Sequence, residues 1–531
     1  MIVIKRLFSG HMPARPLRTV LVMLLFVALL GVAPAMAGQA QSAAAAPEST
    51  LHITSRLVVL DVVVVDSAGH FVQNLDRSQF IVTEDKVPQT IRNFDPPAGH
   101  QMPPGSATAP VVNSSADLPK IGTAPVNILV FDEVNTPFHH LAYARQMMEK
   151  YLRAQPEVLP IPTLFVAAGS TKIAVLHDYT QSRADLLESI KTHTSDLDFT
   201  TVMNGLNGGN GGADNGMVKT LGALSQIAES VRGVPGRKNV IWVGTGYGKA
   251  GDLNNMSQSD YFKVLAAIQR VTDRMLAARV TLYTIDPEGV AATDPGQGQQ
   301  IDPTATGGAT GSYGNNMAFE SFATATGGRV IGGRNDLEKQ IAQVSAEGTE
   351  YYTLAYAPTS TNDAKRPYRR IRVTMKNPSL RAITREGYFS GDAPVAPVAP
   401  NRQKQSEELK FDLLNAAKTT LVYSGLHMKA VSSKGGYTLL VNANDLRFVE
   451  QDDGSRLAEV TVIGVCFNAK GKELSQHAAE LKERLEATDQ IGPASQAAFS
   501  FGFTVSPGTA NIRFVMRDAA TGNLGSANTN P

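Results

Sequence analysis

The chain contains a single cysteine, Cys466, so it cannot form an internal disulfide bond. This cysteine lies within an apolar run, residues 462–467, and has no basic or histidine-rich sequence around it. Such surroundings favour a small buried side chain in a strand over a reactive thiol. The 531 residues suffice for about three or four domains, and domains of that size are stable without disulfides. The shortage of cysteine therefore does not exclude export.

Charge is also sparse, because Asp, Glu, Lys and Arg together form only 18% of the chain and the formal net charge is +1. The first 37 residues hold four basic and no acidic residues, so the rest of the chain is slightly acidic. A nearly neutral chain offers no electrostatic basis for attraction to a phosphate backbone or an anionic membrane. We therefore do not expect nucleic acid as a partner.

Motifs of common catalytic sites are missing from the sequence. It has no G-x-S-x-G nucleophile elbow and no H-E-x-x-H zinc motif. A glycine-rich stretch at 244–248 follows a strand pattern, but Lys249 replaces the third glycine of a dinucleotide-binding turn. Ala250 stands where a P-loop needs Ser or Thr. The sequence predicts a protein that is not an enzyme; the alternatives are a secreted hydrolase with an unrecognised site or a structural component of the cell envelope.

The N-terminus has the features of a secretory signal peptide. Basic residues precede an apolar stretch at 20–32, and Ala35-Met36-Ala37 forms an A-x-A cleavage pattern. The apolar stretch is shorter than the ~20 residues that span a bilayer. We expect cleavage near Ala37–Gly38 and a secreted or periplasmic mature protein without a transmembrane helix. The alternative is an uncleaved anchor helix.

Strand patterns occur in two separate segments. Residues 51–95 alternate apolar and polar side chains in about four short runs, and three further runs lie at 351–356, 369–375 and 382–389. Neither segment alone has enough strands to bury both faces of a sheet. We therefore predict one β-sandwich that is formed by 51–95 together with 350–390. Two separate small β units are the alternative.

The segment between these strands, residues 126–349, alternates apolar strand patterns with amphipathic helix patterns. This alternation predicts an α/β domain with a doubly wound, mostly parallel sheet that helices cover on both faces. We expect the apolar run at 127–132 to be a strand at the centre of that sheet. A glycine-rich stretch at 204–216 is predicted to be an irregular loop before a helix at 217–231.

A proline-rich spacer separates these domains from a C-terminal region with strand-like runs and a possible helix at 473–487. We predict a second β-sandwich there. The full predicted organisation is a signal peptide (1–37), a linker (38–50), the first part of the sandwich (51–95), a second linker (96–125), the α/β domain (126–349), the second part of the sandwich (350–390), a proline-rich linker (391–407) and a C-terminal β-rich domain (408–531).

Five stretches carry a family resemblance. They read Asn127-Ile-Leu-Val-Phe-Asp-Glu-Val-Asn-Thr136, Lys238-Asn-Val-Ile-Trp-Val-Gly244, Thr281-Leu-Tyr-Thr-Ile-Asp286, Ala325-Thr-Gly-Gly-Arg329 and Tyr351-Tyr-Thr-Leu-Ala-Tyr-Ala-Pro358. With them, the α/β segment resembles a von Willebrand factor type A (VWA) domain, in the VWFA-related variant typical of acidobacterial secreted proteins. The resemblance implies a Rossmann-like fold whose role is protein–protein binding or adhesion.

The resemblance also implies a position for a divalent cation, the metal-ion-dependent adhesion site. The family holds the ion with Asp-x-Ser-x-Ser after the first strand, a threonine from a later loop and an aspartate after the fourth strand. Asp132 and Thr136 match the first motif, and Thr201 or its neighbour Thr200 offers the later threonine. Mg²⁺ requires about six oxygen ligands, so these three residues form an incomplete site.

Two family ligands are replaced in this chain. Val134 stands at the position of the first serine, and Thr245, between two glycines, stands where the second aspartate belongs. Asn135 and Asp286 are candidates to supply further oxygens. We therefore expect no cofactor, or at most weak binding of Mg²⁺ or Mn²⁺ at a degenerate site.

Ligands bind at the carboxyl ends of strands in open α/β sheets, and loops on a rigid scaffold carry function. We expect a protein partner to contact the loops at this edge, which are residues 132–138, 200–216, 245–256 and 287–316. The binding-loop candidates are Asn135, Thr200, Thr245 and Asp286.

Overall fold

The computed structural model describes residues 57–104, 110–169, 173–195, 211–247, 257–287, 318–332, 336–359, 368–389 and 413–531. The predicted signal peptide, the predicted linkers at 38–50 and 391–407, Thr200 and Thr201 lie outside these residues, as do most of the segments 200–216, 245–256 and 287–316. The described chain is of the mixed α/β class, with several sheets. Within it, no helix is both long and apolar enough to cross a membrane.

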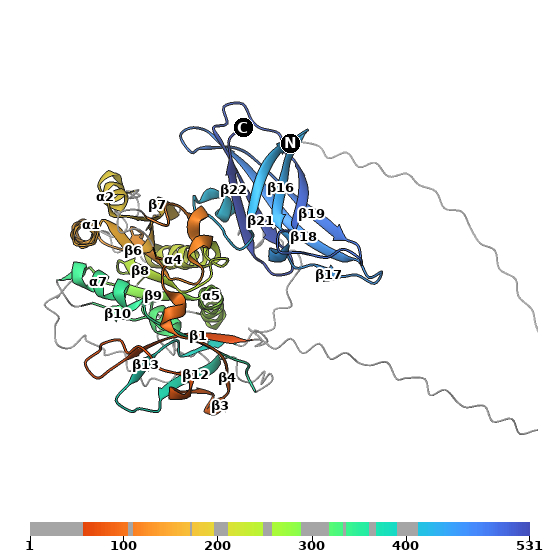
Figure 1. Cartoon of the computed structure of the whole chain (residues 1–531). Helices are drawn as coiled ribbons and strands as arrows, with labels where there is room; N and C mark the ends of the chain where they lie inside the picture. Colours follow the sequence, from red (N-terminus) through yellow and green to blue (C-terminus); the bar gives the residue numbers. More distant parts are fainter. Residues whose placement is uncertain are drawn as a thin grey trace, which may run out of the picture. The chain divides into compact units, whose positions relative to one another are not determined.

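A six-stranded sheet forms the centre of the α/β domain, in the order β10-β9-β8-β5-β6-β7 (Figure 1). All neighbouring strands are parallel except β6 and β7, which are antiparallel. β5 is an interior strand, paired with β8 on one side and β6 on the other. The strands are β5 (Val126–Asp132), β6 (Val158–Ala168), β7 (Ile173–Ser182), β8 (Lys238–Val243), β9 (Val280–Ile285) and β10 (Val330–Ile331).

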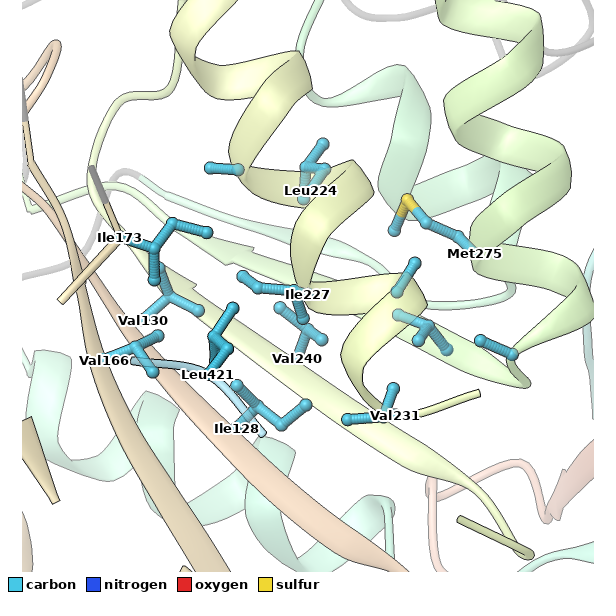
Figure 2. Packing of buried hydrophobic residues seen from close by; sticks show 14 of the residues in the cluster. Ile128, Val130, Val166, Ile173, Leu224, Ile227, Val231, Val240, Met275 and Leu421 are labelled. Atoms are coloured by element: carbon cyan, nitrogen blue, oxygen red, sulfur yellow. The ribbon is translucent and has the colours of Figure 1, made fainter. Parts of the chain in front are cut away.

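Helices lie on both faces of this sheet. Successive residues of β5 point to opposite faces, and each set packs against a different group of helices. Ile128 and Val130 belong to one core cluster with residues of α4 and α5, and Leu129 and Phe131 belong to another with residues of α1, α2 and α7. Figure 2 shows Ile128 and Val130 facing the first of these helix layers. The helices are α1 (Phe138–Arg153), α2 (Arg183–Thr192), α4 (Gly211–Ser230), α5 (Gln258–Ala277), α6 (Ser321–Thr326) and α7 (Leu337–Glu347).

Two four-stranded sheets adjoin the α/β domain, in the orders β13-β1-β11-β4 and β14-β12-β2-β3. Each contains strands from before and after the α/β segment, and their inner faces share one core cluster that includes Leu60, Val82, Leu354 and Val373. The strands are β1 (Val58–Val65), β2 (Phe80–Glu84), β3 (Val87–Gln89), β4 (Ile91–Asp95), β11 (Tyr352–Tyr356), β12 (Tyr368–Met375), β13 (Arg381–Ile383) and β14 (Gly387–Phe389). Short 3-10 helices occupy Arg77–Gln79, Pro97–His100 and Ser115–Ile121.

The C-terminal region forms one sheet of order β15-β16-β20 and a second of order β17-β18-β21-β22, in which β19 also pairs with β18. Residues from both sheets, such as Leu439, Phe499, Val462 and Phe514, form its core. The strands are β15 (Met428–Ser433), β16 (Gly436–Asn442), β17 (Val449–Glu450), β18 (Arg456–Phe467), β19 (Glu473–Leu485), β20 (Gln496–Gly502), β21 (Asn511–Asp518) and β22 (Leu524–Thr529); a 3-10 helix covers Ala443–Asp445.

Two sequence predictions were wrong. The helix expected at 473–487 is strand β19, which pairs with β18 along its whole length. Its Ala, Glu, Leu and Lys residues favour a helix in isolation, but pairing with a neighbouring strand overrides so weak a preference. The loop expected at 204–216 ends earlier than predicted, because α4 already begins at Gly211. Glycine disfavours a helix by about 1 kcal/mol, which packing of the later turns can outweigh.

A segment that the sequence assigns to the C-terminal region packs on the α/β sheet. Leu421 is buried in the same cluster as Ile128 and Val166, and Figure 2 shows it beside them. Hydrogen bonds fix the segment on both sides, since Val175 N donates to Thr420 Oγ1 (3.2 Å) and Ser424 N donates to Ser230 O (3.1 Å). The α/β core is thus completed by residues beyond the proline-rich linker.

Replacing Leu421 by Ala should lower the free energy of unfolding by about 2–5 kcal/mol, because it leaves a cavity in this core. Urea denaturation followed by fluorescence of Trp242, the chain's one tryptophan, measures this loss. Val422→Ala is the matched control, since Val422 is 40% exposed and should change stability by less than about 0.5 kcal/mol. Equal effects of the two substitutions would contradict the packing of this segment.

Lys238, at the start of β8, is a buried amine. Its Nζ donates to Val234 O (2.6 Å) and Gly236 O (2.9 Å), and the residue is almost completely excluded from solvent. Burial, with a smaller effect of the Arg279 charge, lowers the pKa of Lys238 to about 7. The unfolded chain, with an ordinary lysine pKa, therefore binds more protons than the folded chain above pH 7.

Stability should accordingly rise with pH between about pH 7 and pH 9, by up to about 1.4 kcal/mol per pH unit. Lys238→Met removes the titrating group and should flatten this rise, although it lowers stability overall because two carbonyls lose their donor. Urea denaturation of both proteins at pH 7, 8 and 9 gives the two slopes. The same slope in both would show that Lys238 does not titrate in this range.

Candidate functional site

Asp132 ends β5 and marks the carboxyl edge of the central sheet. The loop 133–137 follows it, and α1 begins at Phe138 after Pro137. Asp132 is fully buried although it carries a carboxylate. A buried charge is stable only where its oxygens are satisfied by hydrogen bonds or opposite charges.

Four N–H donors surround the Asp132 carboxylate. Oδ1 accepts from Val134 N (3.0 Å) and more weakly from Asn135 N (3.3 Å), which holds the loop that follows β5. Oδ2 accepts from Trp242 Nε1 (3.1 Å) and Gly246 N (2.9 Å), which belong to β8 and the loop after it. An ionised carboxylate has about four acceptor positions, so these donors occupy all of them.

The loop after β8 approaches Asp132 very closely. Thr245 N donates to Thr136 Oγ1 (3.2 Å), and Thr245 Oγ1 donates to Asn135 O (3.1 Å). Gly244 has φ +151°, and a Cβ on it would lie 2.3 Å from the Cβ of Asp132 and 2.5 Å from Thr136 Oγ1. Only glycine fits at this position, so the sequence Gly-Thr-Gly here serves the contact between two loops.

α4 is joined to the same edge. Asn135 Nδ2 donates to Thr220 Oγ1 (2.9 Å), and Thr220 Oγ1 in turn donates to Gly216 O (2.9 Å). We call the hydrogen-bonded set of Asp132, Asn135, Thr136, Trp242 and Thr245, with their loops, the Asp132 latch. It connects β5, β8 and α4 at one end of the sheet.

The hydrogen bonds of the latch show whether a divalent cation fits the residues that the family resemblance assigns to a metal site. The structure brings Asp132, Thr136, Asn135 and Thr245 together, whereas Thr200 and Thr201 lie outside the described residues. Asp286 follows β9, two strands from β5, and its N–H donates to Ile331 O (3.0 Å). The two oxygens of Asp132 and Thr136 Oγ1 already accept N–H donors, so these residues do not fit a metal in this arrangement. Among the described residues, no three His, Cys, Asp or Glu side chains gather as metal ligands.

The electrostatics of Asp132 reflect two opposing effects. Burial raises the pKa of the carboxyl and is the larger effect, while the bonds from Trp242 and the three backbone N–H groups lower it. All four contacts are donors to Asp132. If Asp132 were protonated, one of its oxygens would become an O–H donor and would lose its hydrogen bond from an N–H group.

Sequence reasoning missed two pairs at this edge. Trp242 was assigned only to a strand, yet its indole N–H is a partner of Asp132 and its ring packs against Phe319, with centroids 5.2 Å apart. Glu133, which follows Asp132 and is buried, contacts His193 Nε2 (2.7 Å). The chain's one tryptophan, at the centre of a buried strand, was the available signal for the first pair, since a buried indole N–H needs an acceptor.

Two large apolar side chains remain exposed on residues that are close in sequence to members of the latch. Phe138 is 68% exposed and Val218 is 69% exposed, the highest values for large hydrophobic residues in the described chain. Phe138 follows Asn135 by three residues, and Val218 precedes Thr220 by two. Both residues are therefore close in sequence to the hydrogen bond between Asn135 and Thr220, although Val218 points to a different side of α4 from Thr220.

The chain is similar to a solved structure of another protein. The crystal structure of the TFIIH p34 N-terminal domain is similar over 31% of this chain and 81% of that chain, with 12% sequence identity and a TM-score of 0.17. A TM-score this low carries no argument about fold or function. No protein-family model matches the chain, and no curated protein matches it.

Asp132→Asn should lower the free energy of unfolding by about 2–3 kcal/mol although it preserves shape, because the new amide places an NH₂ group against two N–H donors. Urea denaturation followed by circular dichroism measures the loss. Asp76→Asn is the control, since Asp76 is an exposed helix cap that accepts from Ser78 N and Asn caps equally well. If both substitutions cost the same, the four donors do not define the role of Asp132.

Proposed function

We propose that this protein is secreted or periplasmic and is not an enzyme, and that its VWA-like domain binds a protein partner through the carboxyl edge of the central sheet. The observation that carries the proposal is the position of Phe138 and Val218. Both are exposed, and both are close in sequence to polar groups of this edge that are already bonded to one another. Exposed apolar side chains on a rigid scaffold are typical of protein-binding surfaces.

Several features support the finer assignment to a VWA-like, doubly wound domain. The sheet is parallel except for one edge strand, helices cover both faces, and an aspartate ends an interior strand. The two strand segments that flank the domain share both sheets of one sandwich. We propose that the sandwich is the base on which the VWA-like domain is mounted.

The state of the carboxylates favours binding over hydrolysis. A hydrolase needs an acid or base that is free to exchange a proton with a substrate. Asp132 is committed to four N–H donors, and Glu133 is buried against His193. These two acids serve to fix loops, and a fixed edge binds a partner with a smaller entropic cost.

The proposal is tested with the chain from Gly38 to Pro531 immobilised as bait for an envelope extract. We expect captured proteins that fall at least tenfold when Phe138→Ser and Val218→Ser are combined, since truncating central apolar contacts commonly costs that much affinity. Val431→Ser on β15 is the control, because Val431 is 49% exposed and lies in the C-terminal region. Unchanged capture by the double variant would exclude this edge as the binding surface.

The same bait gives a metal test. Capture and melting temperature should be equal in EDTA and in millimolar Mg²⁺ or Mn²⁺, because four N–H donors already occupy the acceptor positions of Asp132, the one carboxylate of the expected site. A ligand that binds the folded state raises its melting temperature, so tight binding would be seen as a shift. A rise with Mg²⁺ that Asp132→Asn abolishes would restore the metal-dependent interpretation.

A further inference from the structure

A cavity of about 480 Å³ opens between α4 and α5, away from the Asp132 latch. Its volume lies within the ~300–1,000 Å³ that small-molecule sites usually have. The cavity is lined by these two helices, by Asn415 and Tyr423, and by the turn between β21 and β22. We call it the arginine cavity, after the four arginines that line it, which are Arg232, Arg270, Arg274 and Arg517.

Helical spacing brings the polar residues of α4 and α5 to one side. On α4, Gly222, Ser225, Gln226 and Glu229 follow one another at spacings of one to three residues over about two helical turns, and they line the cavity together. On α5, Arg270 and Arg274 are four residues apart and face the same space. The two helices thus contribute polar side chains to the cavity beside the apolar Leu221, Ala267 and Val271.

The charges of the cavity are strongly unequal. Four arginines are opposed by one lining carboxylate, Glu229, so the walls carry an excess of three positive charges. Glu229 is already paired with Arg232 (3.6 Å) and Arg274 (3.5 Å). Arg274 also donates to Ser225. An arginine cluster in a partly enclosed space costs free energy unless an anion neutralises it.

A further acid, next in sequence to the lining residue Arg517, is already bonded elsewhere. Asp518, beneath the turn of β21 and β22, accepts from the backbone N of Thr521 (3.0 Å) and from its hydroxyl (2.5 Å), and it does not line the cavity. Arg270 is exposed, and no ion pair is found for it among the described residues. It is therefore the cation most available to an incoming anion.

Two uncharged features of the cavity, an amide oxygen unpaired among the described residues and open space at a glycine, also suit a bound ligand. Gln226 Oε1 is buried and has no hydrogen-bond partner within the described chain. Rotating this side-chain amide would turn its NH₂ group, a donor for an anion, toward that space. Gly222 has open space in front of it, since a Cβ there would meet no atom within 4 Å. The cavity thus has room beside its arginines.

We propose that the arginine cavity binds a small polyanion that carries two or more carboxylate or phosphate groups. Arginine forks pair with both kinds of group, often through two parallel hydrogen bonds. The size of the cavity suits a compact molecule, and the nearly neutral chain as a whole does not favour a long polyanion such as nucleic acid. Neither Phe138 nor Val218 lines the cavity, so this proposal does not depend on the proposed function.

Citrate and pyrophosphate are the probes, one for each chemical source, titrated into the full chain by calorimetry at constant ionic strength and without metal. Saturable one-site binding of citrate alone would assign a polycarboxylate, and binding of pyrophosphate alone would assign a phosphorylated ligand; binding of both would support the shared chemistry. If neither binds at millimolar concentration, the proposal is overturned.

Two substitutions separate charge from space. Arg270→Gln should weaken binding at least tenfold, because one charge-assisted hydrogen-bond partner is lost. Gly222→Leu keeps every arginine but fills the cavity, and it should weaken binding as much while leaving the melting temperature equal or higher, since glycine disfavours a helix interior. Arg372→Gln on β12, an exposed arginine outside the cavity, should leave affinity within twofold.

Binding that survives both Arg270→Gln and Gly222→Leu would place the anion elsewhere and overturn the proposal. An equal loss with Arg372→Gln would also overturn it, because the effect would then be one of overall charge. The Phe138→Ser and Val218→Ser double variant should bind the anion like the original protein. Failure of the partner-binding proposal and failure of this one are therefore distinguishable.

Discussion

The arrangement of the carboxyl edge depends on one buried carboxylate. Asp132 accepts two N–H groups from its own loop and two from β8 and the loop beyond it, so one side chain fixes both loops. The close approach of Gly244 and the bond from Asn135 to Thr220 follow from that geometry. The four N–H donors thus organise this edge in the described structure.

A second constraint comes from the shared sandwich. Its two sheets each require strands from both ends of the α/β segment, and a partly buried ion pair connects one of them to the α/β domain. Asp61 on β1 accepts a hydrogen bond from Arg279, which follows α5. Burial raises the pKa of Asp61, but the charge and hydrogen bond of Arg279 contribute most to the opposite effect, and the pKa lies below its ordinary value. The ion pair gives the junction a specific geometry, because neither group is satisfied without the other.

The helices and strands were predictable where the local pattern of apolar residues determines them. The apolar run at 127–132 became a buried interior strand whose alternate residues serve two cores, and the strand count before and after the α/β segment suggested a shared sandwich. Local preference failed for β19, where pairing with β18 decides. The site was predictable in position only: Asp132 and Thr136 lie where expected. The partners of Asp132 could not be read from the sequence, because Trp242 is 110 residues away and meets it only through the parallel pairing of β5 and β8.

The interleaved sandwich also governs the order in which the chain can fold. β1 lies between β11 and β13, so both of its neighbours come from residues beyond 350. As the chain is synthesised from its N-terminus, β1 has no strand to pair with until nearly 300 later residues have emerged, a separation visible in the Val58↔Tyr356 register. Such distant pairing slows folding and leaves apolar strands exposed to aggregation. β1 therefore stays without its native neighbours until most of the chain has emerged.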